Sequence, residues 1–93
     1  MAATIPKISV ILPTYGRRHI LPRTIASVFA QDEKDFELIV VDDRSKDDTG
    51  AYLASLTDPR IRVLTPPGNL GTAGARNFGL QAARADAVAL LDD

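Results

Sequence analysis

The sequence predicts an α/β fold: a Rossmann-like parallel sheet with helices on both faces, truncated at its fourth strand. Two observations predict this class. Short segments that are apolar at nearly every position alternate with segments that carry helical periodicity or helix-start residues. Continuously apolar strands are typical of parallel sheets, because helices cover both faces of such sheets. The expected order of elements is therefore β-α-β-α-β-α-β.

The first half of the chain contains two expected strands and one expected helix. The segment ISVIL, residues 8–12, is short, rich in β-branched residues and closed by Pro13, so we expect a buried strand. A helix is expected at residues 21–30, where Pro22 suits the first turn. Its apolar residues recur at the spacing of one helical face: Leu21, Ile25, Val28 and Phe29. The second strand is expected at residues 36–41.

The second half is expected to contain two helices and two strands. A weaker helix is expected at residues 48–56, with Asp47 or Asp48 as its N-terminal cap. The other expected segments are a third strand, a loop rich in Pro and Gly, a third helix and a fourth strand: residues 61–64, 65–74, 75–83 and 87–91. The chain ends on an apolar strand whose free edge could pair with another copy in a homo-oligomer. We therefore interpret residues 1–93 as a single partial domain.

Composition excludes several classes of function. The 93 residues carry 11 basic and 12 acidic side chains, a net charge of -1, so no nucleic-acid partner is expected. There are no cysteines and one histidine, which excludes disulfides, thiolate metal sites and a histidine-rich zinc site. No apolar stretch approaches the ~20 residues of a membrane span and no signal peptide is recognised. We expect a cytoplasmic location, with membrane association of the full-length protein left open.

Polar clusters follow three of the expected strands, at residues 13–15, 42–43 and 92–93. They should meet at the carboxyl edge of the sheet, where such sheets bind ligands. A carboxylate at the end of a buried strand needs a hydrogen-bond donor or a cation. Asp43 could accept bonds from the backbone around Ser45 and Lys46, or it could face a ligand. Adjacent acids at a second strand end, Asp92 and Asp93, suit Mg2+ or Mn2+ bound together with a phosphate.

The loop before the third helix has glycines at three-residue intervals, Gly68, Gly71 and Gly74. It matches neither the dinucleotide fingerprint nor the P-loop. One interpretation is a flexible connection. The other is a phosphate contact, because Arg76 in the first turn of the expected helix could bind a phosphate through two of its guanidinium nitrogens.

The segment PTYGRRH offers weaker candidates. Tyr15 could stack on a base or cover the edge of the core. Arg17 and Arg18 could contact phosphates, although at least one of them is expected to be solvated. His19 is given no role.

Five segments follow one another along the chain: ISVILPTYGRR, SVFAQ, FELIVVDDRSKDDT, NLGTAGARNFGL and ADAVALLDD. Their order and spacing resemble the successive motifs of family 2 glycosyltransferases, which have the GT-A nucleotide-sugar-binding fold. The resemblance covers nearly the whole chain. Its most specific parts are VDD-x-S-x-D-x-T and N-x-G-x-x-x-A-R-N.

The resemblance implies a role for each matching residue. Asp43 would contact the base, usually uracil, while Asp42 would hold the loop. Arg76 lies in the motif that closes over the nucleotide. Asp92 and Asp93 match the start of the D-x-D metal motif, so both are expected at the metal. The complete set expected to bind nucleotide is Pro13, Thr14, Tyr15, Asp43, Arg76 and Asp92.

Two positions depart from the family pattern. Gly16 stands where the family often has Asn, and Arg44 where it often has Gly. Arg44 would need a turn without a positive φ, or would accept a small strain.

The expected function is that of the N-terminal, nucleotide-binding half of an inverting glycosyltransferase. It would bind a nucleotide-diphosphate sugar, with UDP-sugar favoured, and Mg2+ or Mn2+. The acceptor would be a hydroxyl of a sugar, lipid or polysaccharide. No catalytic residue is assigned, because the general base is expected beyond residue 93, and the piece alone is expected to be inactive.

Two alternatives remain at this point. One is a non-catalytic signalling module that holds Mg2+ beside a phosphorylated Asp. Such domains need a later lysine, and no lysine follows Lys46. The other is a fragment that serves folding or assembly only.

Overall fold

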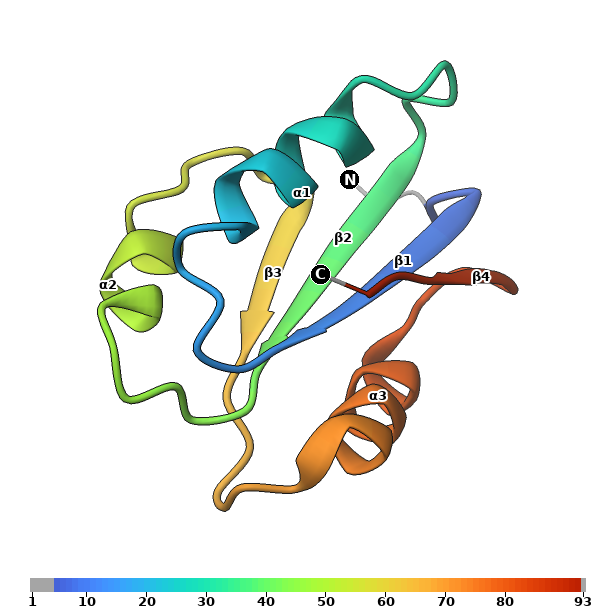
Figure 1. Ribbon diagram of the computed structural model, residues 1–93. Helices are drawn as coiled ribbons and strands as arrows, with labels where there is room; N and C mark the ends of the chain where they lie inside the picture. Colours follow the sequence, from blue (N-terminus) through green and yellow to red (C-terminus); the bar gives the residue numbers. More distant parts are fainter. Residues whose placement is uncertain (1–4, 93) are drawn as a thin grey trace.

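The computed structural model describes residues 5–92 and confirms the predicted order of elements (Figure 1). The elements are β1 (Ile8–Thr14), α1 (Leu21–Phe29), β2 (Phe36–Asp42), α2 (Thr49–Ala54), β3 (Ile61–Leu64), α3 (Gly71–Ala82) and β4 (Ala87–Leu90). All strand pairs are parallel, and the strands lie in the order β3-β2-β1-β4. The predicted α/β class with a parallel sheet is therefore correct.

The strand order reverses beside β1. The chain passes from β1 to β2 and β3 on one side, and then crosses to β4 on the other side. In register, Thr14 of β1 lies level with Asp42 of β2, so the two strands end together. Open α/β sheets bind ligands beyond the carboxyl ends of the strands at such a reversal.

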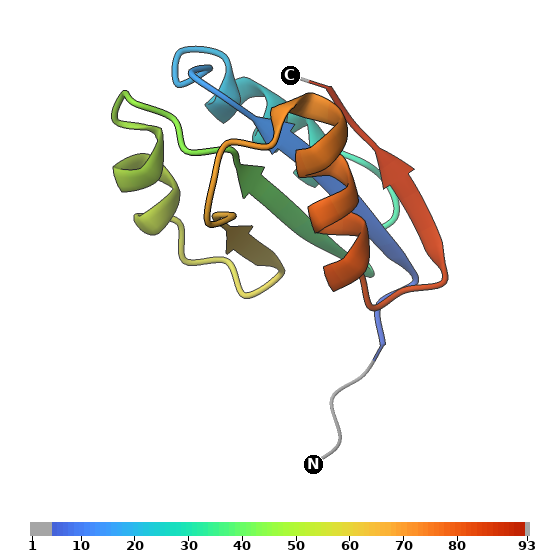
Figure 2. The same ribbon diagram turned by 90° about the horizontal axis from the view of Figure 1, so that it is seen from below.

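Helices cover both faces of the sheet, as Figure 2 shows for α3 on one face and α1 behind the other. Successive residues of a strand face opposite sides, so β2 contributes to two cores. Leu38 and Val40 pack with α1 and α2, whereas Ile39 and Val41 pack with α3. Every residue of β2 is buried, which accounts for the continuous apolar run from Leu38 to Val41.

Several predicted boundaries differ from the structure. Strand β1 continues through Pro13 to Thr14, because the parallel pairing with β2 extends that far. Helix α2 is shorter than predicted; Asp48 is its cap residue without a side-chain bond, while the Asp47 carboxylate accepts the Thr49 N–H. The remaining strands and α1 agree with the prediction to within one residue at each end.

The largest error concerns α3, which begins at Gly71 and not at Ala75. The predicted loop, residues 65–74, is therefore four residues too long. Gly71 and Gly74 have weak helix propensity, so local sequence gives little sign of this first turn. An acceptor from another strand holds the turn in place, as described below.

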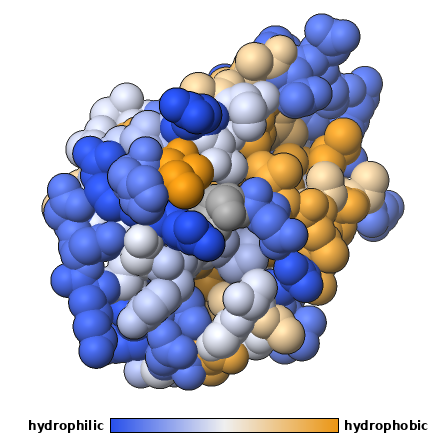
Figure 3. Space-filling model, in the orientation of Figure 1, coloured by the Kyte–Doolittle hydropathy of each residue, from blue (hydrophilic) through white to orange (hydrophobic). Residues whose placement is uncertain are grey.

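Strand β4 forms one edge of the sheet, and all four of its residues are exposed. Hydrophobic side chains gather on the side of the molecule where β4 lies (Figure 3). Val88 and Leu90 are 40% and 53% exposed. Pairing of this edge with another copy stays a prediction.

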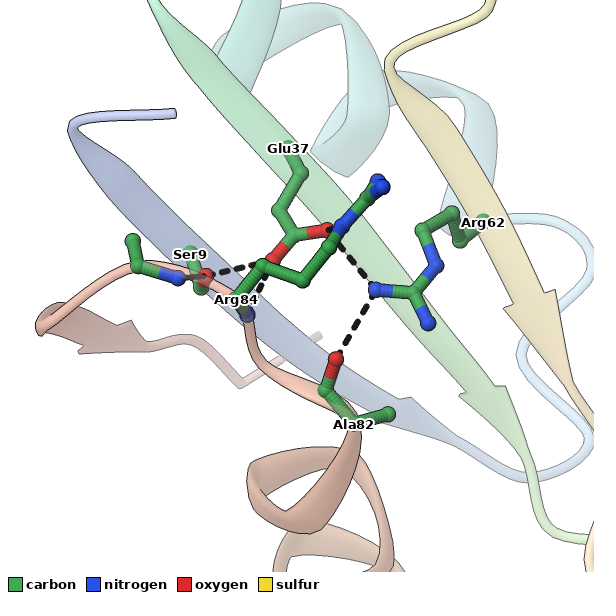
Figure 4. Close-up of polar contacts among 6 residues, drawn as sticks. Ser9, Glu37, Arg62, Ala82 and Arg84 are labelled. Atoms are coloured by element: carbon green, nitrogen blue, oxygen red, sulfur yellow. Dashed lines mark hydrogen bonds and ion pairs between the residues drawn. The ribbon is translucent and has the colours of Figure 1, made fainter. Parts of the chain in front are cut away.

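A buried carboxylate lies at the amino end of the sheet, on the α3 side, at the centre of a network of hydrogen bonds (Figure 4). Glu37 of β2 is 2% exposed. It accepts bonds from the Ser9 hydroxyl at 2.6 Å and the Arg84 N–H at 2.7 Å. The guanidinium groups of Arg62 and Arg84 donate to its other oxygen at 2.8 and 3.1 Å. The same Arg62 nitrogen donates to the Ala82 carbonyl at 2.9 Å, so the network includes the last residue of α3.

These contacts control the ionisation of Glu37. Burial alone would raise its pKa, but the bonds from Ser9, Arg84 and Arg62 outweigh burial and lower the pKa from 4.5 to about 2. A pKa that is lower in the folded chain contributes stability above the unfolded pKa. That contribution is lost as the pH falls from about 4.5 towards 2.

We expect the stability difference between the wild-type chain and Glu37→Gln to depend on pH. Urea denaturation should show the largest difference near neutral pH, shrinking by roughly 3 kcal/mol between pH 4.5 and 2, because Gln does not titrate. Glu33→Gln is the control, since the contacts of Glu33 are exposed: an ion pair with Lys7 at 3.8 Å and a bond from the Asp35 N–H at 2.9 Å, which a Gln oxygen can also accept. A difference that stays constant with pH would contradict the role assigned to Glu37.

We also expect Gly79→Ala to destabilise the fold. A Cβ at this position would lie 2.7 Å from an Ile11 methyl and 2.9 Å from a Val41 methyl, both on β-branched side chains of the sheet. Overpacking should exceed the gain in helix propensity and leave a net loss of about 1 to 2 kcal/mol in thermal or urea unfolding. Gly68→Ala is the matched control, because a Cβ there meets nothing within 4 Å.

Candidate functional site

A cavity of about 670 Å³ lies at the carboxyl edge of the sheet. The end of β1, the loop after β2, the first turns of α3 and the segment after β4 contribute to its wall. Its lining residues are Pro13, Thr14, Tyr15, Arg17, Asp43, Lys46, Asn69, Gly71, Thr72, Ala75 and Asp92. Five of the six residues predicted to bind nucleotide are among them, all except Arg76. The structure thus brings the three predicted polar clusters together.

Asp43 links β2 to the start of α3. Its side chain is buried, and its two carboxylate oxygens accept the N–H groups of Leu70 at 2.8 Å and Gly71 at 2.9 Å. The Asn69 amide donates to the Asp43 carbonyl at 2.9 Å. Asp43 therefore caps α3 and does not bind the backbone around Ser45, which corrects that alternative. Each carboxylate oxygen accepts one of these bonds and so keeps further acceptor capacity towards the cavity that Asp43 lines.

Asp42, and not Asp43, binds the backbone at Ser45 and so holds the loop after β2. One of its oxygens accepts the Ser45 N–H at 3.0 Å. The Ser45 hydroxyl in turn accepts the Gly16 N–H at 2.9 Å. This chain of bonds fixes the loop after β2 to the loop after β1. Both loops border the cavity through Lys46 and Arg17.

The two departures from the family pattern both adopt a positive φ. Gly16 has φ 64°, a conformation that glycine adopts without steric cost. Arg44 has φ 63°, so its turn does require the left-handed region and carries a strain of about 1 to 2 kcal/mol. Its guanidinium reaches the Pro66 carbonyl at 3.5 Å, across to the loop before α3.

The adjacent arginines have different environments. Arg17 lines the cavity, and its side chain makes no ion pair within residues 5–92. Arg18 lies 3.6 Å from the Asp48 carboxylate and stacks 4.2 Å from the centre of the Tyr52 ring. Arg18 thus fixes the β1–α1 loop to α2, and Arg17 is the one available to a ligand. Lys46 supplies a second cation at the cavity wall.

Arg76 contacts the cavity indirectly. One of its guanidinium nitrogens donates to the Asp92 carboxylate at 3.2 Å, joining α3 to the segment after β4. Its Nε atom is buried without a hydrogen-bond partner in the described part of the chain. The Asp92 side chain is 82% exposed, so its carboxylate remains accessible from the cavity.

The predicted metal residues can be placed only in part. Asp92 lies at the cavity wall, and Asp93 lies outside the described residues. Within residues 5–92, no three acidic, imidazole or thiol groups lie close enough to hold a metal ion by themselves.

Comparison with known proteins identifies the family. The sequence model of glycosyl transferase family 2 matches residues 9–93. The chain belongs to glycosyl transferase family 2.

Relatives of this family match nearly the whole chain. A GalNAc(5)-diNAcBac-PP-undecaprenol beta-1,3-glucosyltransferase of Campylobacter jejuni is 43% identical over 91 residues, covering 95% of this chain and 29% of the relative. The succinoglycan biosynthesis protein ExoO of Rhizobium meliloti is 39% identical over 88 residues, covering 95% of this chain and 25% of the relative. The chain thus spans about a quarter to a third of the length of these curated relatives.

Solved structures confirm the GT-A fold. The mannosyltransferase PcManGT of Pyrobaculum calidifontis, in complex with GDP-Man and Mn2+, superposes with a TM-score of 0.84 at 26% identity, over 96% of this chain and 28% of that one. TarS 1-349 of S. aureus, in complex with UDP-GlcNAc, gives 0.82 at 32% identity, over 92% and 26% of the two chains. The comparisons do not favour a signalling module.

None of the helices within residues 5–92 has the length and apolar character needed to cross a bilayer.

Sequence reasoning singled out Gly71 but missed three polar residues at the cavity: Lys46, Asn69 and Thr72. Asn69 is a fixed position of the N-x-G motif, so the motif offered a signal for it. Nothing in the sequence distinguishes Lys46 or Thr72 from ordinary surface residues.

We expect Asp43→Ala to destabilise the chain by about 2 kcal/mol, because two helix N-terminal N–H groups lose their acceptor. Urea denaturation followed by circular dichroism measures this cost without any ligand. Asp92→Ala is the control and should change stability little, since its ion pair with Arg76 is exposed. Equal stability of the two variants would contradict the capping role of Asp43.

Proposed function

We propose that residues 1–93 form the N-terminal, nucleotide-binding part of a glycosyltransferase that uses a UDP-sugar and a divalent cation. The observation that carries this proposal is the cavity itself, where a buried carboxylate, an exposed tyrosine and two cations meet at the carboxyl edge of the sheet. A nucleoside diphosphate combines ring N–H donors, an aromatic face and negative charge, and so complements all three.

The base would lie between Asp43 and Tyr15. The Asp43 oxygens keep acceptor capacity that the N3–H of uracil could use. Tyr15 lines the cavity and is 49% exposed, so its ring could stack on the base. Pro13 and Thr14 line the same cavity.

Arg17 and Lys46 would attract the diphosphate. They come from two loops that Asp42 and Ser45 join, so both cations are held at the same cavity. Charge-assisted bonds to phosphate are among the stronger hydrogen bonds in proteins. Arg76 would hold Asp92 in position through its ion pair.

The divalent cation, Mg2+ or Mn2+, would be held by Asp92 and Asp93 together with oxygens of the diphosphate. One or two carboxylates plus substrate phosphates is the usual way in which proteins bind Mg2+, so a site without three protein ligands is suitable. The bound cation would neutralise charge on the departing diphosphate. The Mn2+ and GDP-Man named for the solved mannosyltransferase support this cofactor class.

The whole protein would transfer the sugar with inversion. An acceptor hydroxyl would lose its proton to a carboxylate outside this chain and form a bond to the anomeric carbon, while the bond to the diphosphate breaks. The undecaprenol-linked substrates in the names of two relatives support a lipid-linked acceptor, and with it a cytoplasmic protein that works at the membrane surface. The chain described here would bind the donor without catalysing transfer.

UDP is preferred over GDP on the basis of the relatives. A 39% identical glucosyltransferase of Escherichia coli is named for UDP-Glc, and TarS, at 32% identity, was solved with UDP-GlcNAc. The relative solved with GDP-Man is less similar in sequence, at 26% identity.

Isothermal titration calorimetry of UDP, with GDP as comparison and with or without Mn2+, tests the proposal. UDP should bind more tightly than GDP, and Mn2+ should strengthen binding. Arg17→Ala should weaken UDP binding by about tenfold and reduce its salt dependence. Arg18→Ala is the matched control, an adjacent arginine whose side chain contacts Asp48 and Tyr52, and it should leave binding nearly unchanged.

Two results would overturn the proposal. If the folded chain binds neither nucleotide, it does not contain a formed donor site. If GDP binds more tightly than UDP, the assignment of the base is wrong. An equal loss in the Arg17 and Arg18 variants would show that Arg17 has no special place at the ligand.

A further inference from the structure

We propose that Glu37 is a positioning residue for the cavity: it fixes the C-terminal end of α3 and thereby sets where the first turn of α3 forms the cavity wall. Glu37 lies at the amino edge of the sheet, at the opposite end of β2 from Asp43. The proposal concerns the geometry of the site, and only its ligand readout rests on the proposed function.

Side chains on one face of β2 and of the residue that follows it lie near both ends of α3. Because strand residues alternate between faces, Glu37, Ile39, Val41 and Asp43 all lie on the α3 side. The six residue steps from Glu37 to Asp43 span about 20 Å, and the 12 residues of α3 span about 18 Å. The strand therefore places one carboxylate at each end of the helix, with two apolar side chains between them.

The two carboxylates bind the helix ends in complementary ways. Asp43 accepts the N–H groups of Leu70 and Gly71 at the N-terminal end. At the C-terminal end, Glu37 accepts the Arg84 N–H and orients Arg62, which donates to the Ala82 carbonyl. Asp43 thus satisfies backbone groups of the helix N-terminus directly, whereas the Ala82 carbonyl is satisfied by Arg62 of β3, which Glu37 holds in place.

The middle of α3 packs on the sheet through apolar contacts. Its buried positions are the small residues Ala75 and Gly79, and Phe78 and Leu80 pack against the same core from partly buried positions. Apolar packing is not directional, whereas a hydrogen bond fixes the positions of both its partners. The polar contacts at the two ends of α3 therefore add a restraint along the helix axis that the apolar contacts do not supply by themselves.

A shift of α3 along its axis would change the cavity. Gly71, Thr72 and Ala75 all line it. The hydrogen bonds from Leu70 and Gly71 to Asp43 would lengthen with the same movement. Release of the helix at Glu37 should therefore be detectable at the other end of the strand.

Amide hydrogen exchange by NMR on the full chain tests this without ligand. The variant is Glu37→Gln, and the matched control is Val40→Ala, on the same strand but facing α1 and α2. The two are compared at urea concentrations that give equal global stability. We expect the amides of Leu70 and Gly71 to exchange about tenfold faster in Glu37→Gln than in Val40→Ala. Arg62→Met, which removes the contact to Ala82 from a partly exposed position, should show the same effect more weakly.

Affinity for UDP gives the second readout, with an expected weakening of about fivefold in Glu37→Gln and none in Val40→Ala. Equal exchange at Leu70 and Gly71 in the variants and the control would overturn the inference. If Glu37→Gln does not fold, the Arg62→Met comparison decides. If the wild-type chain does not bind UDP, the proposed function fails, while the exchange measurement still decides the role of Glu37.

Discussion

The interaction on which the site depends is the one between the Asp43 carboxylate and the first N–H groups of α3. A carboxylate that is 4% exposed needs donors, and a helix that begins with two glycines in four residues needs an external acceptor. Each group satisfies the other, and the partial positive charge at the helix N-terminus adds to the stabilisation. Because the contact forms beside the cavity, the same bonds that stabilise the fold also place the cavity wall.

The adjacency of Asp42 and Asp43 follows from strand geometry. Consecutive residues of a strand face opposite sides, so two neighbouring acids at a strand end serve two different loops. Asp42 holds the loop after β2 and, through Ser45, the loop after β1. Asp43 holds the loop before α3. Three loops from three strand ends are thereby fixed to the end of one central strand, and the hollow between them is the cavity.

The sequence predicts the parts of this structure that depend on local pattern. The order of elements and both sheet faces follow from apolar runs and helical periodicity, and the convergence of Tyr15, Asp43 and Asp92 follows from parallel topology. The start of α3 was not predictable locally, because its cap lies 27 residues earlier in the chain. Glu37 was overlooked for the same reason. Within an apolar strand it resembles an isolated exception, and its arginine partners lie 25 and 47 residues away.

Asp43 alone does not select a base under the proposed function. Uracil offers the N3–H and guanine the N1–H, so a carboxylate acceptor can bind either ring. Selection must then come from the space and polarity around the ring, where Tyr15, Lys46 and Asn69 line the cavity. Asn69 is already engaged with the Asp43 carbonyl, which fixes its side chain. A fixed neighbour excludes a larger ring more effectively than a mobile one, since the mobile one can move aside. The bonds that hold the loop before α3 would therefore also set the size of the base that fits.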